Sequence, residues 1–520
     1  MFRKILAAVL AVTMVLLLLC GCGDSDKVKE KKSEKKNTAE EIVISSYKPD
    51  TLCPVLSTNE ANIGMLGIVY DSLISLPDNL FPESCLAESW SVSENGIKWH
   101  FALRKDVMWH DGTAFGAEDV IYTIETIKKN ENSIYAYNVS LLDKIQKNGD
   151  FELEISLKEP CINFASLLYF PIIKKQDGEI NKGTFRPIGT GPYRLEDRND
   201  GNILYLVKND SWWGGEAVTD CITVKMLPDN DTALYTFSSG SIDMTLSEDM
   251  NWGRFVDPIS ASYVSMPTPI FHFLGINHNN EVLGLKEVRR ALSLAINRSK
   301  LAEEVMMGYA TESSIPIHPK WFVWGDKKIE FKQSFSGAKK ELHENGWEIK
   351  NENYQKTVDD KTWTLELGIL YNEENRQRKE IAEAVKQNLE ELGIKSHTEA
   401  VSFEEYNTRI QEGDYEIFIG STIISPELTF SLIIGENNVF GFENEKIDEA
   451  MKAIGSKHSV SGIEEGYGKL IDCFDELNPV VGLFFEEKIM VYNKRIENGI
   501  TPSYFDAYKG IEFLRKEESK

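Results

Sequence analysis

The side chains able to do covalent or metal chemistry are scattered along this chain instead of grouped. Its eight histidines show no metal-ligand spacing. His272 and His278 could in principle hold a metal, but they are six positions apart and no third ligand is evident. The sequence has no Gly-x-Ser-x-Gly elbow, no His-Glu-x-x-His pair and no Gly-x-x-x-x-Gly-Lys loop. We therefore expect no enzyme, no catalytic residue, no cofactor and no metal; a hydrolase is the rival interpretation.

Two of the seven cysteines, Cys20 and Cys22, directly follow an apolar run at residues 5–19. A basic pair precedes this run, whose length is typical of a signal-peptide core and short for a membrane-spanning helix. The Leu-Cys-Gly-Cys sequence that ends at Cys22 resembles the lipobox of bacterial lipoproteins. The resemblance implies that residues 1–21 are a lipoprotein signal peptide and that Cys22 is the lipidation site. An ordinary secretory signal and a retained membrane anchor are the alternatives.

The segment after this cysteine is polar and highly charged. Residues 24–41 contain a single valine among many lysines and acidic residues, with no periodicity. Such a segment cannot bury enough apolar surface to become ordered. We expect residues 22–41 to form a flexible tether.

The rest of the chain has the composition of a soluble globular protein. It is 42% hydrophobic and 27% charged overall, and its 520 residues exceed what one hydrophobic core serves, so two or three lobes are expected. The formal net charge of −25 disfavours nucleic acid as a partner. The five cysteines after Cys22 form no Cys-x-x-Cys pair, so stability must come from core packing, with one disulfide left open.

Hydrophobic periodicity predicts the elements that would position a binding site. Alternating apolar residues predict strands at 97–103 and 151–157, with a helix between them at 117–129. A helix at 376–392, capped by Gly393, lies between two strands and indicates an α/β fold with a partly parallel sheet. Further strands are predicted at 42–47, 203–207, 222–227, 364–370, 394–395 onward, 415–420 and 480–491. Further helices are predicted at 60–73 and at 288–296, where Arg289, Arg290 and Arg298 lie off the apolar stripe.

Several blocks of sequence resemble one family and occur in that family's order. The blocks are LAESW at 86–90, GIKWHFALRK at 96–105, WHDGT at 109–113, AEDV at 117–120, PIGTGPY at 187–193, VRRALSLAINR at 288–298 and VYNKR at 491–495. They resemble family 5 solute-binding proteins, the oligopeptide-, dipeptide- and nickel-binding components of ABC importers. We interpret the blocks as structural: His110 as a hydrogen-bonded turn residue, Gly112 as a glycine with an unusual backbone angle, and 189–192 as a sharp turn.

The resemblance implies an α/β fold of the two-lobed periplasmic-binding-protein type (type II), a clamp with an extra subdomain in lobe one. The expected parts are lobe one at 42–69 plus 189–274 plus 488–520, its subdomain at 70–188, and lobe two at 275–487. Chain crossings near 275–277 and 488–491 would act as hinges. A solute that contacts both lobes would then favour the closed state.

Ligand-binding residues are expected where the two lobes face each other. Peptide-binding members of the family place an aspartate four residues before a proline that follows a lobe-two strand. Here Pro426 puts Thr422 at that position, and the segment 421–425 carries no charge. The charged amino terminus of an ordinary peptide would therefore lack a counter-charge here. The alternative is that the alignment is shifted and that Glu427 or Glu416 replaces the aspartate. Family resemblance and position nominate seven ligand-binding residues: Thr58, Asn59, Phe271, His272, Gly420, Ser421 and Thr422.

The implied function is that of the substrate-binding lipoprotein of an ABC importer. It would capture an oligopeptide or related small solute between the lobes and deliver it to the permease subunits. The peptide would have its amine bound elsewhere, or be modified or cyclic. A sugar, a metal chelate or ligand sensing without transport are the alternatives. We expect a monomer, anchored by lipid to the cell membrane and facing the extracytoplasmic side, with no nucleic-acid partner.

Overall fold

The computed structural model describes residues 41–178, 180–198, 200–247, 249–257, 259–330, 332–436, 438–455 and 459–517. Cys22, the signal peptide predicted at 1–21 and the tether predicted at 22–41, apart from Glu41, lie outside these residues. Glu41 is the first residue of the opening strand.

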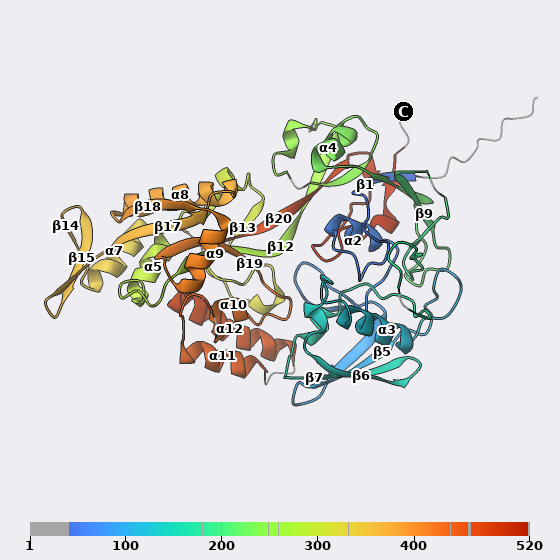
Figure 1. Ribbon diagram of the computed structural model, residues 1–520, viewed down its shortest axis with the longest axis horizontal. Helices are drawn as coiled ribbons and strands as arrows, with labels where there is room; N and C mark the ends of the chain where they lie inside the picture. Colours follow the sequence, from blue (N-terminus) through green and yellow to red (C-terminus); the bar gives the residue numbers. More distant parts are fainter. Residues whose placement is uncertain are drawn as a thin grey trace, which may run out of the picture. The chain divides into compact units, whose positions relative to one another are not determined.

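One mixed sheet of eleven strands runs through the described part of the chain (Figure 1). Its strand order is β18 (Lys395–Val401), β17 (Glu366–Asn372), β19 (Ile417–Ile423), β12 (Ala261–Ile276), β20 (Val481–Asn493), β11 (Met244–Ser247), β1 (Glu41–Ser46), β10 (Cys221–Met226), β9 (Ile203–Lys208) and β8 (Tyr193–Leu195), with β13 (Ala310–Glu312) also paired to β20. We call the part around β1 and β8–β11 lobe one, and the part around β17–β19 lobe two.

Two long antiparallel strands, β12 and β20, join the lobes (Figure 1). The first half of β12 pairs with β20 as far as Pro267, beside β11 of lobe one. From Ile270 to Ile276 the same strand pairs with β19 of lobe two. Beyond the register shift between Pro267 and Phe271, β12 therefore gains β19 as a second partner while it still pairs with β20 as far as Leu274, and Gly275 pairs with Phe418.

A separate four-stranded antiparallel sheet forms the subdomain, with helix α3 (Ala117–Lys128) against it (Figure 1). Its order is β4 (Ala87–Val92), β5 (Lys98–Leu103), β7 (Glu152–Leu157) and β6 (Leu142–Gly149). The strands and the helix predicted here are confirmed, because alternating apolar residues such as Trp99 and Phe101 are buried on one face.

Lobe two is built on a βαβ unit. The parallel strands β17 and β18 are joined by helix α8 (Arg376–Leu392), whose left-handed C-cap Gly393 is confirmed. The other helices of the lobe are α5 (Lys286–Ala295), α6 (Arg298–Lys300), α7 (Phe335–Glu344), α9 (Phe403–Glu412), α10 (Ser431–Ile434), α11 (Glu445–Gly455) and α12 (Val460–Leu477). A three-stranded antiparallel sheet projects from it: β14 (Glu348–Lys350), β15 (Asn353–Val358) and β16 (Lys361–Thr364).

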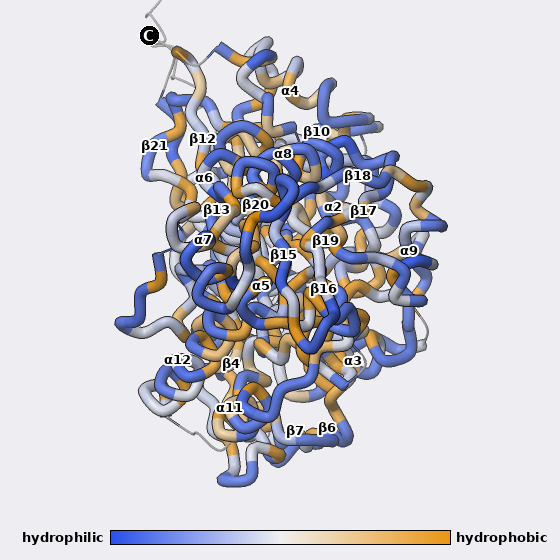
Figure 2. The backbone as a smooth tube through the Cα atoms, turned by 90° about the vertical axis from the view of Figure 1, so that its left-hand side faces the viewer, coloured by the Kyte–Doolittle hydropathy of each residue, from blue (hydrophilic) through white to orange (hydrophobic). Residues whose placement is uncertain are grey.

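Shorter elements complete the described chain. They are helices α2 (Glu60–Leu66) and α4 (Asn230–Ser238), the strand pairs β2 (Ile74–Ser75) with β3 (Glu83–Ser84) and β21 (Ile496–Glu497) with β22 (Arg515–Lys516), and single turns at Tyr137–Val139, Phe164–Leu167, Trp252–Arg254, Leu301–Val305, Phe322–Trp324 and Ile511–Phe513. Figure 2 shows hydrophilic residues on outer turns such as those of α8, and hydrophobic residues along the inner strands.

Helix α2 ends seven residues before the end predicted for it at 73. The sequence continues to look helical, but the main chain of Val69 turns away and accepts a hydrogen bond from Gly191 N at 3.0 Å. A Cβ on Gly189 would stand 1.8 Å from Val69 O, so this approach requires glycine. The chain bends at 190–192 directly before β8, as we predicted, and the glycines of the 187–193 block also permit this close backbone packing.

The 109–113 block packs against the same glycines. His110 N donates to Gly189 O at 2.9 Å, and the His110 ring bonds Gly189 N at 3.2 Å and Gly191 O at 3.0 Å. Burial lowers the pKa of His110 to about 4, so the ring is a neutral structural group. Gly112 has the positive φ, +80°, that we predicted. The family blocks therefore build the fold.

Two arginines predicted off the apolar stripe of α5 are buried instead. Arg289 is 4% exposed and donates to the carbonyls of Leu477 and Asn478, where α12 ends. Arg298 is 2% exposed and donates to Gly482 O at 2.9 Å. Burial lowers the pKa of each to about 10. Carbonyl oxygens at the end of α12 attract the guanidinium of Arg289, and a main-chain carbonyl of β20 accepts from Arg298, which explains how these charges enter the interior.

The five cysteines of the described chain all carry free thiols. Burial raises the pKa of Cys53 and of Cys161 to about 12, which keeps these thiols unreactive. The disulfide that the sequence left open is not formed among these five residues.

Candidate ligand-binding cavity

A cavity of about 1070 Å³ lies where segments of both lobes and of the subdomain meet. This volume is at the upper end of the roughly 300–1,000 Å³ typical of small-molecule sites, so it has room for a large solute. Its walls come from α2, from the ends of β1 and β11, and from stretches within 134–138, 167–171, 422–433 and 503–512.

The sheet of lobe one places its strand ends at this cavity. Strands β1 and β11 are parallel neighbours, so Ser46 and Ser247, their last residues, lie at the same edge. Both residues line the cavity. Ser45 Oγ donates to Thr245 Oγ1 at 2.7 Å across this pair. Ligands of open α/β sheets bind at the carboxyl ends of their parallel strands, and this cavity has that position.

A hydrogen-bonded loop holds Thr58 at the rim. Asp50 accepts from Ser57 Oγ at 2.6 Å and from Thr58 N at 2.9 Å. The next residue, Asn59, is the N-cap of α2 and accepts from Asn62 N at 3.0 Å. Thr58 lines the cavity, whereas Asn59 is outside the lining and its side chain caps the helix.

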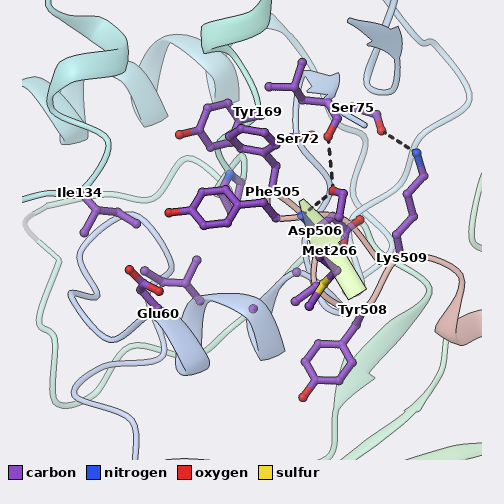
Figure 3. Close-up of a pocket in the computed structure, with 18 of the residues that line it drawn as sticks. Glu60, Ser72, Ser75, Ile134, Tyr169, Met266, Phe505, Asp506, Tyr508 and Lys509 are labelled. Atoms are coloured by element: carbon purple, nitrogen blue, oxygen red, sulfur yellow. Dashed lines mark hydrogen bonds between the residues drawn. The ribbon is translucent and has the colours of Figure 1, made fainter. Parts of the chain in front are cut away.

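Aromatic rings form much of the wall (Figure 3). The rings of Tyr169 and Phe505 meet edge to face, with their centroids 4.8 Å apart. Tyr135 lies 6.1 Å from Tyr169, and Tyr508 projects from the same C-terminal segment as Phe505. Such a wall offers large apolar surface to a solute.

Three carboxyl groups lie along the lobe-one side of the cavity. Burial raises the pKa of Asp506 to about 6 and that of Glu512 to about 7. Burial also raises the pKa of Asp71, although its carboxylate accepts from Trp213 Nε1 at 2.9 Å. Charges on Asp71 and Asp506 further raise the pKa of Glu512. This side of the cavity is therefore acidic and partly protonated near neutral pH.

Two lysines also line this side, and they contact two further carboxylates, those of Glu83 and Glu60. Lys509 Nζ lies 3.3 Å from Ser75 Oγ and 3.5 Å from Glu83, as Figure 3 shows for Ser75. Lys488 Nζ contacts Glu60 at 2.6 Å. The lobe-one side thus carries both signs of charge, and each lysine is paired with a glutamate.

Lobe two contributes no charged side chain to the described lining. Its part consists of Thr422, Ile423, Ile424, Ser425, Pro426, Thr429, Phe430, Ser431, Leu432 and Ile433. Glu416, one of the two alternatives to an aspartate at position 422, is outside the cavity lining, and its carboxylate accepts a hydrogen bond from Gly368 N. Glu427 is 3% exposed and lies behind the wall, where its carboxylate accepts from Tyr137 and Ser425.

Two of the seven nominated residues, Thr58 and Thr422, lie in the cavity wall, one from each lobe. Phe271 is fully buried and packs on Phe485, with ring centroids 4.9 Å apart. His272 is 3% exposed, stacks on Phe484 and contacts Glu486.

Gly420 and Ser421 lie in β19, outside the cavity wall. A Cβ on Gly420 would meet the rings of Phe273 and Phe418 within 3 Å. Ser421 Oγ accepts from Arg378 Nη2 at 3.4 Å.

Sequence reasoning missed most of the wall. The segment 503–512, together with Ile134, Tyr137 and Tyr169, carries no periodicity and no family block among those recognised. The signal available was the cluster of aromatic residues at 504, 505 and 508 in an otherwise polar terminus.

The comparisons with known proteins agree with this geometry. The family model of bacterial extracellular solute-binding proteins, family 5 (middle), matches residues 82–433, more than half of the chain. The chain belongs to this family. Its members are the solute-binding components of ABC transporters, and the two-lobed α/β clamp fold predicted from the sequence is confirmed.

Among the relatives of this family 5 protein is the oligopeptide-binding protein AppA of Bacillus subtilis, 25% identical over 501 residues that cover 90% of each chain. Heme-binding protein A of Haemophilus influenzae is 23% identical over 414 residues, 72% of this chain and 73% of the relative. A nickel ABC transporter structure from Bacillus halodurans has a TM-score of 0.78 at 21% identity, covering 92% of this chain and 100% of the other. The periplasmic murein tripeptide binding protein MppA, in an unliganded open form, has a TM-score of 0.79 at 18% identity, covering 93% and 98%.

Two absences hold for the residues that the structure describes. No helix among them has the length and apolar character needed to cross a bilayer. Across the same ranges, no three His, Cys, Asp or Glu side chains are placed to hold a metal ion together.

Proposed function

We propose that this protein captures an oligopeptide or related small solute and delivers it to the permease of an ABC importer. The observation that carries the proposal is the cavity of about 1070 Å³, which segments of both lobes line at the carboxyl ends of β1 and β11. A solute in this place touches both lobes at once, and such contacts stabilise a closed arrangement. The oligopeptide-binding relative that spans 90% of this chain supports the assignment.

The pairing of β12 and β20 suggests where closure takes place. These two strands carry the chain between the lobes, and the register of β12 shifts between Pro267 and Phe271. Two neighbouring strands that cross directly from one lobe to the other suit a hinge. We propose that lobe one (42–69, 189–274 and 488–520), with its subdomain at 70–188, moves against lobe two (275–487).

The residues facing the solute from lobe two are uncharged, which bears on how a peptide would bind. Thr422 occupies the position where an aspartate would meet the amino terminus of a peptide. A peptide ammonium placed beside Thr422 would lose its hydration without gaining a counter-charge. We propose that the bound peptide has its amine elsewhere or has it blocked. Thr58, from the opposite wall, is the partner we propose across the cleft.

Membrane attachment is a further part of the proposal. The Leu-Cys-Gly-Cys sequence supports lipidation of Cys22, and the charged run at 22–41 supports a tether that lets the binding lobes reach a permease. We propose a monomer on the extracytoplasmic face of the cell membrane that binds its solute without altering it. The binding proteins among its relatives support the absence of catalysis.

Acetylation of peptide amines tests the assignment of the site. We expect the purified chain to bind N-acetylated pentapeptides within about threefold of the free forms in calorimetry, because Thr422 offers no counter-charge. A Thr422→Asp variant should favour the free amine by about tenfold. Loss of all binding on acetylation contradicts our interpretation of Thr422. Mass spectrometry of the solute that copurifies with the protein distinguishes a peptide from a sugar or a metal chelate.

A further inference from the structure

We infer that the solute presents a bulky apolar side to lobe two, and that Ile423 and Leu432 select it. The inference rests on the proposed capture of a solute in this cavity and specifies the class of solute. It concerns the lobe-two wall, whose described lining side chains lack charge.

Large apolar side chains stand exposed on the two walls that face each other here. Ile423 and Leu432 of lobe two are 59% and 67% exposed, and both line the cavity. Ile134 and Tyr137 of the subdomain, 45% and 50% exposed, line it from the other side (Figure 3 shows Ile134). Exposed apolar side chains gathered in a concave site mark a place where an apolar partner is buried.

The distribution of charge around the cavity indicates which side of the solute can be charged and which side must be uncharged. Lobe one and its subdomain supply the charged lining residues Glu60, Asp71, Glu83, Lys488, Asp506, Lys509 and Glu512, whereas the lobe-two residues of the described lining are apolar or carry hydroxyls. A charged group on the solute finds counter-charges only toward lobe one. Against lobe two it would be desolvated without compensation, so that side of the solute must be uncharged.

The lobe-two wall is held in place by its own contacts. Leu428 and Phe430 are non-glycine residues with φ of +60° and +53°, and both are buried. Such backbone persists only where the surrounding structure fixes it, and it gathers at ligand clamps. The short helix α10 that follows turns Ile433 into the core, 1% exposed, and leaves Leu432 facing outward.

Glu427 ties this wall to the subdomain. Its carboxylate accepts hydrogen bonds from Tyr137 and Ser425, and its main-chain oxygen accepts from Asn163 Nδ2 at 3.3 Å. Tyr137 and Asn163 belong to the subdomain, which we propose to move with lobe one, so these bonds fix the segment that carries Ile423 and Leu432 only while the lobes are together as in this structure. A fixed apolar surface loses little entropy when it binds, which suits selection among solutes.

The solute class that fits is a peptide, or a peptide-like compound, with leucine, isoleucine or an aromatic side chain toward lobe two. The test exposes the purified chain to an equimolar pool of random pentapeptides and identifies the captured peptides by mass spectrometry. We expect bulky apolar side chains to be enriched about tenfold over charged ones at one or more positions. In an Ile423→Ser/Leu432→Ser variant this preference should fall to about twofold.

An Ile259→Ser variant is the matched control, because Ile259 is 82% exposed and lies outside the cavity wall. It should keep the full apolar preference. Capture without apolar preference, or a preference that the double variant retains, overturns this inference and leaves the proposed function standing. A pool from which the wild-type chain captures nothing overturns the proposed peptide capture and this inference together. If the double variant loses its native circular dichroism, the inference is judged on the wild-type chain alone, by whether the captured peptides are enriched in bulky apolar side chains.

Discussion

At the scale of single residues, lobe two buries the charged side chains of Arg289, Arg298 and Glu427 in its interior, and its described wall of the cavity is neutral. Arg289 and Arg298 are buried, yet each gives its donors to main-chain carbonyls. Glu427 is buried among hydroxyl groups behind the cavity. Thr422 lines the cavity and carries no charge. Lobe two therefore buries ionic groups in its interior and contributes none of them to the described cavity lining.

Replacing Arg289 with methionine should lower the free energy of unfolding by about 3 kcal/mol, because the carbonyls of Leu477 and Asn478 would lose their buried donors. Arg290 is the matched control. It is partly exposed and only approaches Glu341 at 3.5 Å, so Arg290→Met should change stability by less than about 0.5 kcal/mol. Urea unfolding followed by tryptophan fluorescence measures both. Equal effects of the two substitutions would contradict the role of Arg289.

At the scale of elements, the sequence correctly predicted the strands and helices whose hydrophobic residues repeat with a regular period. Strands β5 and β7 and helix α8 match their predictions, because the burial of one face repeats every two residues in the strands and about every 3.6 in the helix. The end of α2 was predicted wrongly, since it depends on the main chain of Gly189 and Gly191, more than a hundred residues away. The cavity segment 503–512 has no periodicity, and only the folded chain brings it to α2.

Two glycines of α12 should respond oppositely to alanine. A Cβ on Gly468 meets nothing within 4 Å, so Gly468→Ala should stabilise the protein by about 0.5–1 kcal/mol by reducing the freedom of the unfolded chain. A Cβ on Gly466 would lie 2.9 Å from Ile454 Cγ1, so Gly466→Ala should destabilise it by about 1–3 kcal/mol. The melting temperatures of the two variants, compared with that of the wild-type protein, test this contact between α11 and α12. Two shifts of the same sign would show that α12 packs differently.

At the scale of the whole molecule, β12 and β20 connect two lobes that line one cavity, and this arrangement is what the proposed capture needs. The acidic side chains, Asp506 and Glu512 among them, belong to lobe one, and the neutral wall belongs to lobe two. In the proposed capture, a solute that satisfies both sides would draw the lobes together, because its contacts with each would be complete only when the cavity is closed. Capture, closure and selectivity then follow from the same set of contacts.

Small-angle scattering of the purified chain, with and without a saturating amount of a captured pentapeptide, tests this account most directly. We predict that the radius of gyration falls when the peptide binds, and that the peptide is recovered with its mass unchanged. A radius of gyration that stays the same at full saturation would contradict the hinged clamp, and recovery of a cleaved peptide would contradict binding without chemistry.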